Sequence, residues 1–333
     1  MGTTISVVVP YFQKKPGILK RSLRSIFKQN LPSETHVNII VVDDGSPIPA
    51  SSELMELNFS DLFSLHIIKQ INGGVSKARN TALENIDDIT DYIAFMDSDD
   101  VWHEDHLLYA LKAMKSGCDF YFSDNMRSGF HESCFSTYCP QIHCFVERDS
   151  KTKGFSYIPR DVAVNLIIEC FAAQLSTVVY RKSLCKSLRF NEDLKFAGED
   201  MLFLVDILSK SGKVGFSNEI RVECQDGVNI YFSNLGWKYP EYFFRKRDQI
   251  ISHLIIKKRI PLTASGKSIN DSIISKFRHD FTFHVARCTI KNNFKFPLEV
   301  LAMFKSDPYF ILLFPILLIK VCVLYVIGKY HPS

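Results

Sequence analysis

The sequence has no glycine-rich phosphate loop, because no Gly-x-Gly-x-x-Gly follows its first apolar run at residues 5–9. That absence argues against a dinucleotide-binding oxidoreductase and leaves a nucleotidyltransferase without support. A nucleotide site in this chain would therefore be built from acids and a metal ion. A large excess of one charge is also missing: the formal net charge of +4 over 333 residues is too small to indicate nucleic-acid binding.

The nine cysteines form neither a Cys-x-x-Cys metal pair nor the framework of a small disulfide-rich protein. We interpret all nine as reduced thiols that mostly pack as small hydrophobic side chains in a reducing compartment. We also expect no signal peptide, because the first apolar run is short and lacks a basic leader. We therefore expect the catalytic part to stay in the cytoplasm.

Apolar runs and helical periodicity alternate through the first hundred residues. The predicted strands are residues 5–9, 37–42, 63–68 and 92–96. Between them, residues 18–27 and 78–86 have apolar positions at helical spacing. This alternation predicts an α/β protein with a mostly parallel, Rossmann-like sheet flanked by helices.

The pattern weakens in the second half of the chain. Residues 118–160 are interpreted as a mixed, loop-rich segment that covers one end of the sheet. Two further strands are predicted at residues 177–180 and 213–224, with an apolar helix between them. Beyond residue 237 the chain is predicted to be mainly helical.

Three carboxylates follow the predicted strand at residues 92–96, in the sequence Asp97-Ser98-Asp99-Asp100. Carboxylates this close together repel one another unless a cation or strong hydrogen-bond donors compensate their charge. Because ligands of open α/β sheets lie at the carboxyl ends of the strands, a divalent metal ion explains the cluster. The alternative is an acidic turn that caps a helix beginning near His103.

A second acidic pair, Asp43-Asp44, follows the strand at residues 37–42, and Gly45 allows a sharp turn there. A carboxylate at this position can accept a hydrogen bond from a pyrimidine imide or from ribose hydroxyls. Taken alone, Asp-Asp-Gly-Ser is equally typical of a strand-to-helix turn. Two acidic strand ends on the same edge of one parallel sheet nevertheless favour a ligand site.

Two more charged pairs lie at predicted helix starts. Lys77 and Arg79 are placed where basic side chains can meet anionic oxygens, although such residues are more often surface charges. Glu199 and Asp200 precede an apolar helix, where the helix dipole favours acids for structural reasons as well. Each pair alone fits either a site or an ordinary helix start.

Together these segments resemble the inverting glycosyltransferases of family 2, which have the GT-A fold and include bacterial enzymes of polysaccharide and O-antigen synthesis. The matching positions, in the family's order, are residues 6–10, 41–46, 72, 74, 78–80, 95–100 and 198–200. The chain departs from the family at Tyr11-Phe12-Gln13, where a Tyr-Asn pair is usual after the proline. It also lacks the Gln-x-x-Arg-Trp motif of processive synthases, which favours transfer of a single sugar. Trp237 is expected either to stack on a sugar or to pack in a lid.

The resemblance implies a role for each candidate residue. The donor-binding residues that it implies are Pro10, Asp43, Asp44, Lys77, Arg79, Asp97 and Asp99. Asp44 would accept from the uracil N–H, and Asp99 or Asp100 would hold a Mn²⁺ or Mg²⁺ ion that bridges the diphosphate. Asp200 would be the base that deprotonates the acceptor hydroxyl, with Glu199 as its alternate or its orienting neighbour.

Residues 309–327 are almost wholly apolar, interrupted by Pro315, Lys320 and Cys322. The run is near the minimum length for a membrane span, and a lysine in mid-span costs about 2.5–3.5 kcal/mol on insertion scales. The helical neighbours of Lys320 are apolar, so the segment has no polar face. Shallow insertion into a membrane, a tail anchor, and a buried or oligomer-forming helix all stay open.

The expected organisation has four parts. These are a nucleotide-sugar-binding half at residues 1–115, an acceptor-binding half with the catalytic base at 116–230, a helical lid at 231–305 and a membrane-associating tail at 306–333.

The expected activity is metal-dependent, inverting transfer of one hexose, glucose or galactose being favoured, from a UDP-sugar. A GlcNAc- or GalNAc-diphosphate-polyprenyl lipid is the expected acceptor, in O-antigen or capsule synthesis at the cytoplasmic face of the inner membrane. No nucleic-acid partner is expected. The alternative is a non-catalytic module that binds nucleotide sugars or scaffolds an assembly complex.

Overall fold

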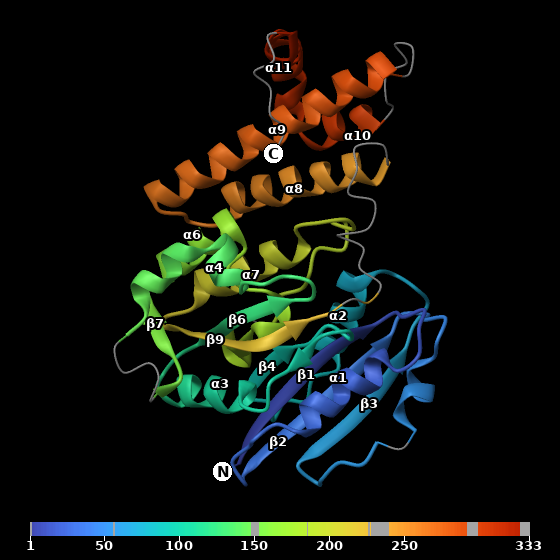
Figure 1. Ribbon diagram of the computed structural model, residues 1–333, viewed down its shortest axis with the longest axis vertical. Coiled ribbons are helices and arrows are strands. Elements are labelled where there is room, and N and C mark those ends of the chain that lie inside the picture. The colour runs from blue at the N-terminus through green and yellow to red at the C-terminus, as the bar shows by residue number, and fades with distance from the viewer. Residues whose placement is uncertain are drawn as a thin grey trace. The chain divides into compact units, whose positions relative to one another are not determined.

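A computed structural model (Figure 1) describes residues 2–55, 57–147, 153–184, 186–225, 227, 240–291 and 299–326. Trp237 lies outside the described residues. The chain divides into two compact units, one of Met1–Glu192 with Phe203–Val228 and one of Asp193–Leu202 with Asn229–Ser333. All eight cysteines of the described ranges are free thiols, in agreement with the prediction.

The first unit is built on a mixed sheet in the order β3-β2-β1-β4-β8-β6-β9-β5, with β7 paired to β9. Its strands are β1 (Thr3–Tyr11), β2 (Thr35–Asp43), β3 (Phe63–Lys69), β4 (Tyr92–Phe95), β5 (Val101–Trp102), β6 (Phe120–Arg127), β7 (Ser156–Ile158), β8 (Val179–Arg181) and β9 (Val214–Cys224). Its α-helices are α1 (Ile18–Phe27), α2 (Val75–Glu84), α3 (His106–Lys115), α4 (Cys134–Tyr138), α6 (Arg160–Cys170) and most of α7 (Glu199–Lys210).

Strands β3, β2, β1 and β4 are parallel neighbours, as predicted, and this part of the sheet positions the acids. Pro10 pairs with Val42 and Tyr11 with Asp43, so β1 and β2 end side by side. The amide of Met96 donates to the carbonyl of Val8 at 3.0 Å, which brings the end of β4 to the same edge. The β1 residues from Thr4 to Tyr11 are buried, because helices cover both faces of a parallel sheet.

The four strands predicted in the first hundred residues are confirmed, and β9 confirms the strand predicted at residues 213–224. The loop-rich interpretation of residues 118–160 is wrong in its first part, because β6 lies inside the sheet between β8 and β9. The apolar run of β6 is only three residues long, at Phe120–Phe122. Its pairing with β9 joins segments about ninety residues apart, which local patterns do not reveal. Strand β5 also intervenes after Asp100, so α3 begins at His106.

The second unit contains helices α8 (Pro240–Arg259), α9 (Ala264–Lys291), α10 (Glu299–Ser306) and α11 (Pro308–Val326). Their shared core includes Phe243, Ile250, Phe281, Val285, Val300, Met303, Phe310 and Phe314. A buried ion pair joins α9 to the start of α11, with a guanidinium nitrogen of Arg278 2.6 Å from a carboxylate oxygen of Asp307. The prediction of a mainly helical C-terminal part is confirmed.

Helix α11 is apolar on its outer side as well as on its packed side. Phe310, Phe314 and Val321 are buried against neighbouring helices. Six large apolar side chains of α11 lie exposed: Tyr309, Ile311, Leu312, Ile316, Ile319 and Val323. Among the described residues, no helix combines the length and hydropathy needed to cross a membrane.

Candidate active site

The carboxyl ends of β1, β2 and β4 gather the acidic segments that the sequence singled out. Asp43 is the last residue of β2, and Asp44 follows it with its amide donating to the carbonyl of Tyr11 at 2.9 Å. The Asp97-Ser98-Asp99-Asp100 segment follows β4 directly and precedes β5. The expectation of one shared edge is therefore met within the first unit.

Asp43 is buried and holds its own loop together. One carboxylate oxygen accepts from the amide of Ser46 at 2.8 Å, and the other accepts from the amide of Ala50 at 2.8 Å. Both oxygens are thus directed at backbone amides of residues 46–50. This geometry shapes the turn after β2.

Asp44 likewise accepts hydrogen bonds from the loop between β3 and α2. One carboxylate oxygen accepts from the side chain of Gln70 at 2.7 Å and from the amide of Gly73 at 2.8 Å. The other oxygen accepts from the amide of Gly74 at 2.9 Å. Gly74 has a φ of 92° at the N-cap of α2, a conformation that favours glycine. The Asp44 carboxylate therefore fixes where α2 begins.

Arg79 reaches from α2 to the acidic segment after β4. Its guanidinium lies 2.8 Å from a carboxylate oxygen of Asp97, and the Arg79 side chain is only 5% exposed. The guanidinium also lies over the ring of Phe190, 5.2 Å from the ring centre. Lys77 is exposed on the same helix. The structure thus brings Arg79, but not Lys77, into contact with the candidate acids.

Gln174 connects two of the three carboxylates, a contact that the sequence did not indicate. Its side-chain nitrogen lies 3.4 Å from an Asp97 carboxylate oxygen and 3.1 Å from one of Asp100. Its side-chain oxygen accepts from the amide of Ser176, whose hydroxyl in turn accepts from the Asp97 amide. No motif marks Gln174, because its partners lie more than seventy residues away.

The departure from the family pattern at Tyr11-Phe12-Gln13 also has a structural role. Gln13 is 3% exposed, and its side-chain nitrogen donates to the hydroxyl of Ser98 at 3.1 Å. The amide of Gln13 donates to the hydroxyl of Ser46 at 2.9 Å. Gln13 therefore ties the end of β1 to both acidic segments.

The acidic segment carries strong electrostatic strain. Burial, and next the nearby charge of Asp97, raise the pKa of Asp99 to about 7. Burial, followed by the charges of Asp97 and Asp99, also raises the pKa of Asp100 well above its usual range. A bound cation would compensate the charges of these carboxylates, since it favours their ionised form.

The donor set of this segment suits a hard divalent cation. Asp99 and Asp100 offer carboxylate oxygens, the ligand type that Mg²⁺ and Mn²⁺ prefer. The described residues contain no group of three or more His, Cys, Asp or Glu side chains arranged to hold a metal ion. A site with one or two carboxylates, completed by diphosphate oxygens, is the usual mode for Mg²⁺ in nucleotide enzymes. The residues fit a metal that binds together with a nucleotide diphosphate.

Gln174→Leu is expected to lower the free energy of unfolding by about 1–3 kcal/mol, because it removes a donor shared by two strained carboxylates. Urea denaturation in EDTA measures the change, and Gln141→Leu at an exposed position is the matched control. Mn²⁺ with UDP should reduce the deficit by compensating the same charges. Equal stability of the two variants in EDTA would show that Gln174 does not support the acids.

Glu199 and Asp200 belong to the second unit and begin α7. A carboxylate oxygen of Asp200 accepts from the amide of Met201 at 2.7 Å, and both acids are half-buried. Gly198 before them has a φ of 84°, and a Cβ there would lie 2.5 Å from the hydroxyl oxygen of Ser252. The sharp turn into α7 thus requires glycine, and acidic side chains are favoured at the start of a helix.

Comparison with known proteins decides the family. A family model described as glycosyl transferase family 2 matches residues 6–138. The succinoglycan biosynthesis protein ExoW of Rhizobium meliloti is 35% identical over 230 residues, which cover 69% of this chain and 71% of ExoW. The chain belongs to glycosyl transferase family 2. Three other curated family relatives match over only 34–44% of their own length.

Solved structures give this family 2 protein its fold. Staphylococcus aureus TarS 1-349 in complex with UDP-GlcNAc is 18% identical with a TM-score of 0.63, covering 99% of this chain and 93% of that one. The mannosyltransferase PcManGT of Pyrobaculum calidifontis, in complex with GDP-Man and Mn²⁺, is 15% identical with a TM-score of 0.53, covering 98% and 88%. The predicted GT-A fold is therefore confirmed for this glycosyltransferase.

Proposed function

We propose that this glycosyltransferase moves one hexose, with glucose or galactose favoured, from a UDP-sugar to a glycan acceptor with inversion at the anomeric carbon. The observation that carries the proposal is the meeting of Asp44, Arg79 and the Asp97–Asp100 acids at one edge of the parallel sheet. Ligands of open α/β sheets bind at this edge. The UDP-GlcNAc complex of TarS, which has the same fold, supports a nucleotide-sugar donor.

In this proposal the donor is bound by the residues of the first unit. Asp44 accepts from the uracil N–H, next to Pro10 at the end of β1. Asp43 acts through the loop that it holds with its two carboxylate oxygens. Arg79 and Asp97 line the pocket as an ion pair, and exposed Lys77 supplies a further positive charge for the diphosphate.

Asp99 and Asp100 are proposed to hold Mn²⁺ or Mg²⁺, and the Mn²⁺ complex of PcManGT supports that assignment. When bound, such an ion neutralises charge that develops on the departing diphosphate. Gln174 would keep Asp100 oriented through its 3.1 Å hydrogen bond, and the backbone amide of Gln225 would do so from the other side at 3.3 Å. Asp100 is thus held in place before a cation arrives.

Asp200 is proposed as the general base. Inversion requires in-line attack by an acceptor hydroxyl, which is a poor nucleophile unless it loses its proton as the new bond forms. Asp200 would take that proton, and Glu199 would orient it or act in its place. Residues 1–115 would bind the donor and residues 116–230 the glycan of the acceptor, and residues 231–305 are proposed as a helical lid.

We propose that the product is a bacterial polysaccharide repeat unit, such as O-antigen or capsule, assembled on a lipid diphosphate with GlcNAc or GalNAc. Similarity to ExoW, a succinoglycan biosynthesis protein, supports polysaccharide synthesis. A lipid-linked acceptor requires the enzyme to reach the inner face of the membrane. The exposed apolar side of α11, at residues 309–323, is the proposed contact with that surface.

Full-length protein is therefore expected to sediment with phospholipid vesicles. Leu312 and Ile316 are 70% and 65% exposed, so the double variant Leu312→Gln/Ile316→Gln should keep the fold. It should bind vesicles at least about tenfold more weakly, since each aliphatic side chain contributes roughly 1.5 kcal/mol or more when buried. Met55→Gln/Ile89→Gln, at positions 71% and 73% exposed, is the matched control. Wild-type protein that stays in the supernatant would remove the membrane contact.

A non-catalytic nucleotide-sugar-binding or scaffold module is the second candidate function. The retention of Asp99, Asp100 and Asp200 speaks against it, because a module without activity has no need for all three. The test is UDP release from UDP-glucose and UDP-galactose with a synthetic lipid-diphosphate GlcNAc or GalNAc acceptor and Mn²⁺. Acceptor-dependent UDP release is the expected result, and tight UDP binding without release would favour the module.

A further inference from the structure

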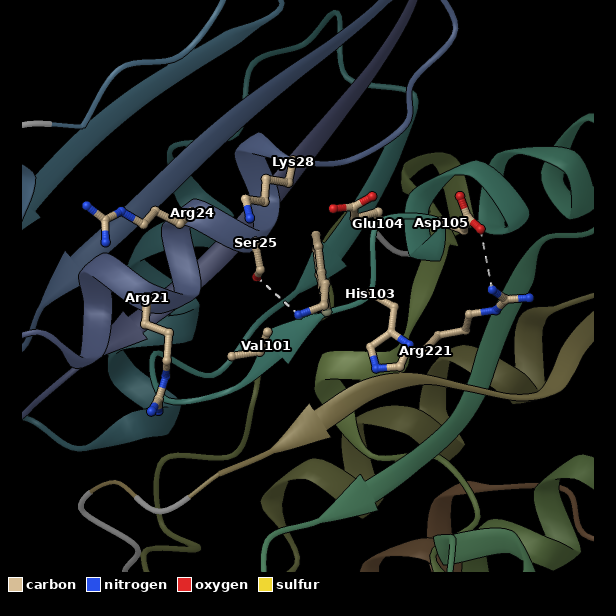
Figure 2. Close-up of a pocket in the computed structure, with 10 residues that line it drawn as sticks. Arg21, Arg24, Ser25, Lys28, Val101, His103, Glu104, Asp105 and Arg221 are labelled. Atoms are coloured by element: carbon tan, nitrogen blue, oxygen red, sulfur yellow. Dashed lines mark hydrogen bonds and ion pairs between the residues drawn. The ribbon is translucent and has the colours of Figure 1, made fainter.

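A groove with several basic side chains lies beside α1 in the first unit (Figure 2). Its volume is about 670 Å³, within the range of small-ligand sites. Its walls come from α1, the β5 segment and the end of β9. The lining residues are Arg21, Arg24, Ser25, Lys28, Val101, Trp102, His103, Glu104, Asp105 and Arg221.

The α1 groove is lined by four basic side chains and by two acidic ones, Glu104 and Asp105, so its net charge is positive. Arg21, Arg24 and Lys28 follow one another along α1 and its C-cap, and α1 contains no acid. Across the groove, a guanidinium nitrogen of Arg221 lies 3.8 Å from a carboxylate oxygen of Asp105, so the charges of these two side chains offset each other. Within the described ranges, the side chains of Arg24 and Lys28 form neither a hydrogen bond nor an ion pair. Their charges are therefore available to an anion.

The spacing of these cations suits a ligand with more than one anionic oxygen group. A rise of 1.5 Å per residue puts the α-carbons of Arg24 and Lys28 about 6 Å apart along the helix axis. Two phosphate groups joined through an oxygen can contact both side chains, and arginine pairs with phosphate through two parallel hydrogen bonds. Val101 and the buried Trp102 form an apolar wall beside them.

The groove wall is hydrogen-bonded to the backbone of the acidic segment. The hydroxyl of Ser22 lies 2.8 Å from the carbonyl oxygen of Ser98 and 2.6 Å from that of Asp100. The guanidinium of Arg21 donates to the carbonyl of Asp99 at 3.1 Å. A ligand in the α1 groove would therefore contact the same helix that holds the proposed metal ligands.

We propose that the α1 groove binds the phosphate or diphosphate group of the acceptor. The assignment rests on the proposed function, in which the donor diphosphate is already matched by Arg79, Lys77 and the metal. A second phosphate-bearing group then requires a second cationic site, and Arg24 with Lys28 supplies one. The cations lie around a partly open hollow and not on a flat surface, which favours a substrate group over a layer of lipid head groups.

The test is calorimetric titration of the full chain with inorganic pyrophosphate in EDTA at low ionic strength, where charge interactions are least screened. Wild-type protein should bind, and Arg24→Ala/Lys28→Ala should bind at least tenfold more weakly. Arg21 is left intact because it contacts the Asp99 carbonyl. Lys115→Ala/Lys210→Ala, which removes two exposed cations at the ends of α3 and α7, is the matched control and should bind like wild type.

Absence of pyrophosphate binding, or equal loss in the two double variants, overturns the proposal. A second outcome also overturns the proposal: wild type binds phosphatidylglycerol vesicles but not pyrophosphate, and Arg24→Ala/Lys28→Ala loses the vesicle binding. That result would identify a membrane contact. UDP binding with Mn²⁺ is measured on the same variants and should not change. Failure of UDP to bind wild type would contradict the proposed function alone, since the pyrophosphate titration contains no metal.

Discussion

Asp200→Asn is expected to lower sugar transfer by on the order of 10²–10⁴-fold, the usual contribution of a general base. UDP binding in the presence of Mn²⁺ should stay within about twofold of wild type, because the proposed donor-binding residues belong to the first unit. Transfer is measured as acceptor-dependent UDP release, and binding by calorimetry. The asparagine keeps an oxygen that can accept from the amide of Met201, so the start of α7 should be retained.

Glu199→Gln is the matched control for this variant, since it removes a charge from the same helix turn. A smaller loss than in Asp200→Asn is expected if Glu199 only orients its neighbour. A larger loss in Glu199→Gln would exchange the two roles. Near-normal turnover in Asp200→Asn would remove Asp200 from the mechanism.

Asp99→Ala is expected to abolish the Mn²⁺-dependent part of UDP binding. Calorimetry with Mn²⁺ and with EDTA should give different affinities for wild type and similar, weak affinities for the variant. The variant should melt at a higher temperature than wild type in EDTA, because it loses one of three mutually repelling carboxylates in a buried segment. Lower metal affinity together with greater stability indicates a removed ligand. A misfolded variant would instead lose both its metal affinity and its stability.

Asp88→Ala is the control for Asp99→Ala. Asp88 is fully exposed, and its substitution removes the same charge from the first unit. It should retain Mn²⁺-dependent UDP binding. If Asp99→Ala also retained it, Asp100 alone would be left as the candidate metal ligand in this segment.

The position of the acids could be predicted from the sequence because local patterns determine it. The β-branched run before Asp43 and the apolar run before Asp97 each specify a buried strand that ends at an acid. Parallel strands then bring their carboxyl ends to one edge without further information. The family resemblance added the roles, and the family and the GT-A fold are confirmed.

The partners of the acids could not be predicted, because they come from distant parts of the chain. Gln174 reaches Asp97 and Asp100 only after β8 has paired with β4, and Gln13 reaches Ser98 across β1 and β4. Nor does the sequence show that both oxygens of Asp43 are directed at loop amides. Strand β6 escaped recognition for a related reason, since its polar second half is supported by pairing with β9.

The central claim is inverting hexose transfer from a UDP-sugar at this sheet edge. The most direct test is NMR of the product formed from UDP-α-glucose or UDP-α-galactose and a synthetic lipid-diphosphate GlcNAc or GalNAc acceptor with Mn²⁺. The account predicts a single added hexose in a β-linkage, formed by wild type and lost in Asp200→Asn. An α-linked product, or no product from either donor despite Mn²⁺-dependent UDP binding, would contradict it.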